Sequence, residues 1–162
     1  MRQNFPLQFA QIFGTIFADF ERMKGRLLMD EKIKWVVKSD YADKNRFKKY
    51  GKKHHDEVVS CTENLERLEK FLNNGGTLQQ AMTFGYFGSE GHDVYRIGQT
   101  GLKSAKETRL YIYAKIVGSE IQVLTIGDKD TQKEDIKNCK AKAKILCNKD
   151  NNTNATTQIQ QR

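Results

Sequence analysis

The chain has 162 residues, a length that suits one domain with an appendage. A compact chain of this size buries about 70% of its unfolded surface, so it needs no disulfide or metal to fold. Its net charge of +8 and isoelectric point of about 9.4 favour a polyanionic partner, although charge that serves solubility alone is the alternative. Cys61, Cys139 and Cys147 are odd in number and have no CxxC spacing, which argues against a disulfide framework and for a reducing compartment.

Residues 1–28 carry apolar side chains at three- and four-residue steps, which predict an amphipathic helix. Its apolar face would pack on the domain or on a second copy of the chain. A helix on a membrane surface over residues 5–27 is the alternative, because basic residues near its end would suit anionic lipid. A third interpretation places these residues upstream of the natural start, since a strand follows directly after Met29.

The same segment bears on the location of the protein. No run reaches the roughly 18 apolar residues of a membrane span, and no signal peptide is visible. We therefore expect a cytoplasmic protein without a membrane partner.

A short strand and a long charged helical segment come next. Alternation over residues 33–39 predicts the strand. Ser39 or Asp40 would cap the helical segment, and Gly51 would divide it into two helices. The sequence "NNGG" at residues 73–76 would end it, because these residues tolerate a left-handed backbone.

Three further strands are predicted over residues 93–98, 108–118 and 120–127, with a tight hairpin turn at Gly118 and Ser119. The last strand is apolar on both faces, which suits a central position in a sheet. The middle strand alternates. Leu110, Ile112, Ala114 and Ile116 share one face, and Arg109, Tyr111, Tyr113 and Lys115 share the other.

The end of the chain is predicted as a helix over residues 131–146 and a disordered polar tail over residues 148–162. The order of elements indicates an α+β domain over residues 29–147, with residues 1–28 as an extra N-terminal helix. We expect a small, mostly antiparallel sheet of about four strands, with a helical hairpin packed on one face.

Helices on one face would leave the other face of the sheet to water. That face would carry Arg109, Tyr111, Tyr113 and Lys115, with Arg96 from the neighbouring strand. An arginine binds phosphate through two parallel hydrogen bonds, and a tyrosine offers a surface on which a base stacks. Basic residues alternating with aromatic ones therefore fit single-stranded RNA. An ordinary solvated face is the alternative.

Other catalytic and metal motifs are weak. The chain has no GxSxG, no phosphate-binding loop and no carboxylate cluster with metal spacing. His92 and the pair His54 and His55 are candidate general bases, although a histidine in a glycine-rich loop is more often simply exposed. A zinc site from Cys139, Cys147 and the histidine pair is disfavoured, because adjacent histidines on a helix point in different directions. We expect no metal and no cofactor.

The order of strand, helical hairpin and then "VYRIG … TRLYIYAKIVGSEIQVLTIGDKDTQKEDI" resembles the RelE/ParE toxin superfamily, most closely its HigB-like, phage-related branch. Toxins of that branch carry an arginine-bearing strand, a second strand with an arginine and then an aromatic residue, a short turn, and an apolar strand that ends in basic residues and "TQ". The likeness covers residues 33–146. The corresponding residues are Arg96, then Arg109 with Tyr111 and Tyr113, then Lys129 with Thr131 and Gln132.

The resemblance implies the toxin of a type II toxin–antitoxin system. Such a toxin is a metal-independent endoribonuclease that cleaves mRNA, often on the ribosome, and it forms an oligomer with an acidic antitoxin that covers the basic sheet. The 2′-hydroxyl of the RNA attacks the adjacent phosphate, while the protein stabilises the developing charge and moves protons. Arg96 and Arg109 would hold the phosphate, Lys129 would stabilise charge or act as an acid, and Tyr113 or Tyr111 would stack a base or transfer a proton. The implied RNA-binding residues are Tyr111, Lys115, Gln132 and Lys133.

The sequence departs from the pattern of that branch in two places. Asp128 and Asp130 flank Lys129, and acids near a phosphate are unfavourable unless they orient the lysine. No clear catalytic tyrosine or histidine follows Gln132. An inactive member, a ParE-like inhibitor of a protein such as gyrase, and a plain RNA- or protein-binding module therefore stay as alternatives.

Overall fold

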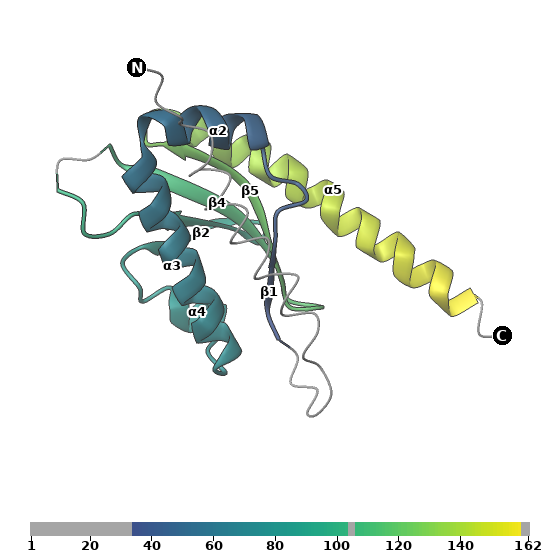
Figure 1. The fold of residues 1–162 in the computed structure, drawn as a ribbon. Coiled ribbons are helices and arrows are strands. Elements are labelled where there is room, and N and C mark those ends of the chain that lie inside the picture. The colour runs from purple at the N-terminus through teal and green to yellow at the C-terminus, as the bar shows by residue number, and fades with distance from the viewer. Residues whose placement is uncertain (1–33, 104–105, 160–162) are drawn as a thin grey trace, which may run out of the picture. The chain divides into compact units, whose positions relative to one another are not determined.

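The structure is a computed structural model that describes residues 34–103 and 106–159, with side chains up to Lys149. Residues 33–162 form one compact unit, separate from residues 1–32. The helix predicted over residues 1–28 lies outside the described residues. Figure 1 shows the elements in the order β1 (Val36–Lys38), α2 (Lys44–Lys53), α3 (His55–Asn73), α4 (Leu78–Ala81), β2 (Phe87–Gly91), β3 (Val94–Gly98), β4 (Thr108–Lys115), β5 (Glu120–Asp128) and α5 (Gln132–Ile159).

The α+β class is confirmed, but the sheet has five strands in the described part of the chain, in the order β1-β5-β4-β3-β2. Neighbours from β2 to β5 pair antiparallel, whereas β1 pairs parallel with β5. The sheet is therefore mixed, where a mostly antiparallel sheet of about four strands was expected. The sequence of β2, "FGSEG", has two glycines and one large apolar residue, so its composition gives little strand signal.

Helices α2 and α3 meet at a different residue from the one predicted. The cap of α2 is Asp43, whose side chain accepts a hydrogen bond from Arg46 N at 3.0 Å, instead of Ser39 or Asp40. The division falls at His54, while Gly51 lies buried inside α2. Helix α3 ends at Asn73, and Gly75 takes a φ of 93°, as the glycine signal predicts.

The two faces of the sheet are covered by different helices. Helix α3 contacts β3 and β4, and α2 contacts β5. Helix α5 packs through Cys139, Ala143 and Leu146 on the opposite face, against the side chains of Tyr111 and Tyr113. Figure 1 shows α3 and α5 on opposite sides of the sheet. The expectation that the face opposite the helical hairpin is left to water is therefore wrong.

Helix α5 also runs further than predicted. It continues to Ile159, through most of the segment predicted to be a disordered tail.

The end of β5 connects α2 and α5. Arg46 of α2 makes a two-point ion pair with the buried Asp135 of α5, with Nη1–Oδ1 at 2.6 Å and Nη2–Oδ2 at 2.9 Å. Thr131 Oγ1 donates to Asp135 Oδ2 at 2.7 Å. This network lies directly over Gly127, where a Cβ would come within 2.7 Å of Thr131 Oγ1 and 2.9 Å of Arg46 Nη2. Only glycine leaves room for the network at this position of β5.

Candidate nucleic-acid interface

Two predicted phosphate-binding residues, Arg96 on β3 and Arg109 on β4, lie on the same face of neighbouring strands. In the register of these strands, Arg96 is opposite Tyr111 and Arg109 is opposite Gly98. Directly paired residues share a face, as do residues two apart on one strand. The structure therefore brings the two arginines together as diagonal neighbours.

The centre of this face is covered by α5. Tyr111 is 0% exposed and Tyr113 is 5% exposed, and both lie in an apolar cluster with residues of α5. Burial also raises the pKa of the Tyr111 phenol. The expectation that these rings lie in water and stack a base is wrong for this structure, because a helix already packs against them.

Arg96 lies at the edge of this face, beside β2. Its Nη1 donates to Glu90 Oε1 at 2.6 Å, and 40% of its side chain is exposed. The guanidinium lies over Gly88, where a Cβ would come within 3.0 Å of its Cζ. Lys140 of α5 reaches the same edge, since its Nζ would lie 3.6 Å from a Cβ on Gly91. Sequence reasoning missed Glu90 and Lys140, because neither belongs to a motif.

Arg109 and Lys129 share one carboxylate. The Arg109 guanidinium pairs with Glu107, and Lys129 Nζ lies 3.5 Å from the other oxygen of the same side chain. The hydrogen bond from Arg109, with the nearby Lys129 charge, holds the pKa of Glu107 below its ordinary value. The structure thus brings these two predicted residues together through Glu107, which sequence reasoning did not identify.

Asp128 and Asp130 pair with Lys106, whereas the sequence suggested that they would orient Lys129. Asp128 Oδ1 accepts hydrogen bonds from the backbone N–H groups of Asp130 (2.9 Å) and Thr131 (3.1 Å), at the start of α5. Lys106 Nζ lies 2.8 Å from Asp128 Oδ2 and 3.2 Å from Asp130 Oδ2. Burial acts to raise the pKa of Asp128, but the hydrogen bonds from Lys106 and the backbone outweigh it, so the pKa is lowered. The two acids therefore begin a helix and anchor Lys106.

The remaining predicted residues are divided between two places. Gln132 and Lys133 lie in the first turn of α5, near Lys129, and Lys133 is exposed. Lys115 lies at the opposite end of β4, about 20 Å from Arg109 at about 3.3 Å per residue. The predicted set therefore does not form a single site.

Helix α2 carries a concentration of positive charge. It has exposed lysines along its length and no acidic residue, whereas Arg46 turns inward to its ion pair with Asp135. Such a helix surface fits the regular spacing of phosphates on a nucleic acid. The exposed lysines are Lys44, Lys48, Lys49, Lys52 and Lys53.

The histidines and cysteines are spread over several elements of the described part of the chain. Among residues 34–103 and 106–159, no three His, Cys, Asp or Glu side chains gather closely enough to hold a metal ion. Cys139 is buried on the face of α5 that packs on the sheet, where burial raises the pKa of its thiol to about 12, and Cys147 is exposed. His92 and Asp93 have φ values of 55° and 56° and form the tight turn between β2 and β3.

Comparisons with protein-family models, with curated proteins and with solved structures found no match to this chain. Within the described part of the chain, no helix has both the length and the apolar character needed to cross a membrane.

Proposed function

We propose that this chain is the toxin of a type II toxin–antitoxin system and cleaves RNA without a metal ion. The observation that carries this proposal is the placement of Arg96 and Arg109 as diagonal neighbours on one face of β3 and β4. Two guanidinium groups so placed suit one phosphodiester and the charge that develops on it during cleavage.

Each arginine is paired with a carboxylate when RNA is absent. Glu90 holds Arg96, and Glu107 holds Arg109 and Lys129. These pairs keep the cations in place on the sheet, and an entering phosphate competes with the carboxylates for them. Because both tyrosines are buried, we assign proton acceptance to Glu90, whose side chain is 11% exposed and lies next to Arg96.

The proposed reaction is an internal transfer. The 2′-oxygen of the RNA attacks the adjacent phosphorus and gives its proton to Glu90. The bond from phosphorus to the 5′-oxygen breaks, and the leaving oxygen takes a proton from Lys129 or from water. The products are a 2′,3′-cyclic phosphate and a 5′-hydroxyl, so atoms balance without a metal or an oxidant.

The net charge of +8 and the lysines of α2 support two partners. One is mRNA, alone or on the ribosome, which the lysines would attract through its phosphates. The other is an acidic antitoxin that covers the arginine edge, formed by Arg96, Glu90 and Lys140, and assembles with the chain.

The test is expression of the chain with a growth assay and mapping of RNA ends. Arg96→Ala and Arg109→Ala should each relieve growth arrest and lower the cleavage rate at least about 100-fold, the effect of losing one positioned donor. Arg67→Ala is the matched control, because Arg67 lies on α3 and donates to Asn64. Full toxicity in both variants, with intact folding, would refute the proposed site.

Nucleic-acid binding without cleavage is the second candidate, and the basic surface of α2 favours it. In that case RNA remains intact, yet it binds the purified chain with an affinity that falls as salt rises. Growth arrest with intact RNA and no RNA binding would instead favour inhibition of a protein target, as the ParE alternative predicts.

A further inference from the structure

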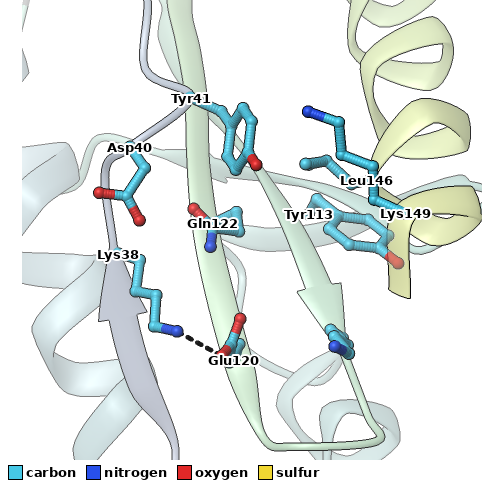
Figure 2. Close-up of a pocket in the computed structure, with 9 residues that line it drawn as sticks. Lys38, Asp40, Tyr41, Tyr113, Glu120, Gln122, Leu146 and Lys149 are labelled. Atoms are coloured by element: carbon cyan, nitrogen blue, oxygen red, sulfur yellow. Dashed lines mark hydrogen bonds and ion pairs between the residues drawn. The ribbon is translucent and has the colours of Figure 1, made fainter. Parts of the chain in front are cut away.

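A pocket of about 260 Å³ lies beside α5, at the end of the sheet opposite Arg109. Figure 2 shows its side chains, which come from β1 and the residues after it, from β4 and β5, and from α5. Its volume is slightly below the roughly 300 Å³ at which small-molecule sites begin, so a ligand would be small. The lining residues are Lys38, Asp40, Tyr41, Tyr113, Lys115, Glu120, Gln122, Leu146 and Lys149.

Gln122 is the unusual residue of this pocket. It lies on β5 directly opposite Tyr113 of β4 and is only 6% exposed. Its Oε1 is buried and has no hydrogen-bond partner. Buried polar atoms nearly always have partners, because leaving one unpaired is costly. An acceptor left unpaired in the lining of a pocket is therefore suited to a ligand that brings an N–H or O–H group.

The rest of the lining adds an aromatic surface and positive charge. Tyr41 is 40% exposed, and the ammonium of Lys149 lies 5.5 Å from the centre of its ring. Lys38 is paired with Glu120. With Lys115 and Asp40, the lining holds three ammonium groups against two carboxylates, so the pocket has an excess of one positive charge. Such a site favours a flat ligand that carries negative charge.

We propose that this pocket binds one nucleotide. Its base stacks on Tyr41 and donates an amino or imino hydrogen to Gln122 Oε1, and its phosphate lies among the lysines. This proposal does not depend on RNA cleavage, since the pocket shares no residue with the edge formed by Arg96, Glu90 and Lys140. The nucleotide is either a free mononucleotide or a single unpaired nucleotide of an RNA strand.

The experiment is calorimetric titration of the full chain with AMP, GMP, CMP and UMP, and with tetranucleotides whose 2′-O-methyl groups prevent cleavage. We expect at least one of these probes to bind. Gln122→Met should weaken that binding about tenfold or more, as loss of one buried hydrogen bond predicts. Gln79→Met is the matched control, because Gln79 is exposed on α4, outside the pocket, and its replacement should leave binding unchanged.

Folding and binding are separated by two further measurements. The midpoint temperature of thermal unfolding should be no lower for Gln122→Met than for the parent chain, because Gln122 Oε1 has no hydrogen-bond partner to lose. Tyr41→Ala changes a residue that is already partly exposed, and it should weaken binding while the chain stays folded. Binding of mononucleotides identifies a free nucleotide as the source, and binding of tetranucleotides alone identifies an RNA strand.

Two results would overturn the proposal. One is that no mononucleotide and no tetranucleotide binds the folded parent chain. The other is binding that is equally strong in Gln122→Met and Tyr41→Ala. Binding that Arg96→Ala abolishes, and that both pocket variants keep, would place the nucleotide at the arginine edge instead.

Discussion

At the scale of single residues, Gly127 lies where β5 meets the ion pair of Arg46 and Asp135. The two charged groups come from helices that are far apart in sequence, and both approach the strand backbone closely because no side chain stands between them. Asp135 is buried, and a buried charge without its partner is costly, so the stability of the fold depends on this space.

Gly127→Ala should therefore lower the free energy of unfolding by roughly 1–3 kcal/mol, the usual cost of an extra methyl group in a filled site. Gly85→Ala is the matched control, since a Cβ on Gly85 would meet nothing within 4 Å. The free energy of unfolding of Gly85→Ala should stay within about 0.5 kcal/mol of that of the parent chain. Urea unfolding followed by the fluorescence of the single tryptophan measures both. Equal stability of the two variants would show that the network moves aside without cost.

At the scale of elements, the start of α5 depends on Asp128. Its carboxylate accepts two backbone hydrogen bonds ahead of the helix and pairs with Lys106. Asp128, the last residue of β5, therefore helps to start the helix, and the same turn places Lys129 beside Glu107. One short turn thus links the fold of α5 to the candidate site.

The lowered pKa of Asp128 predicts a dependence of stability on pH. A carboxyl group whose folded pKa lies below its ordinary value of 3.8 stabilises the fold above that value. The contribution is lost as the pH falls through the lowered pKa. Asp128→Asn keeps an oxygen that accepts the backbone hydrogen bonds but removes the charge that pairs with Lys106. Because neutral hydrogen bonds are weaker than charge-assisted ones, it should cost about 0.5–2 kcal/mol near neutral pH, and the difference from the parent chain should shrink below about pH 4.

Unfolding measured from about pH 7 to about pH 3 tests this dependence. Asp130→Asn is the control, because the side chain of Asp130 is 79% exposed and pairs only with Lys106 in the described contacts. An exposed pair of this kind contributes about 0–1 kcal/mol. A difference for Asp128→Asn that stays constant over the whole range would show that its charge does not stabilise the fold.

At the scale of the whole molecule, residues 33–162 are a compact unit with a five-stranded sheet and a helix on each face. Each face of the sheet is buried by a helix of the same unit, since Leu65, Leu68 and Leu72 of α3 and Cys139 and Leu146 of α5 are all buried. The unit therefore has the apolar core that independent folding requires.

Deletion of residues 1–28 should leave a chain that unfolds in one cooperative transition, because the sheet and both covering helices remain. Urea unfolding followed by fluorescence and by circular dichroism should give coincident curves. Loss of cooperativity in the shortened chain would show that the apolar face predicted for residues 1–28 belongs to the core.

Much of the sheet was predictable from local pattern. The alternation of β4 and the apolar run of β5 are visible in the sequence, and the period of two places Arg109 on the face opposite Leu110. The position of β2 was not predictable, because two glycines in "FGSEG" remove the side chains that mark a strand. Glu90 and Glu107 were not predictable as partners of the arginines, since their ion pairs depend on strand register and loop path.

The sequence by itself determined the α+β class and the strands β4 and β5, because these follow from side-chain period and turn residues. The shared face of Arg96 and Arg109 depends on the register of β3 and β4. Only the tertiary structure decided which face α5 covers. A tyrosine has an apolar ring and a polar tip, so alternation alone does not distinguish a ring in water from a ring beneath a helix. The apolar stripe of α5 packs on Tyr111 and Tyr113, which removes both rings from the surface and confines the candidate site to the arginine edge.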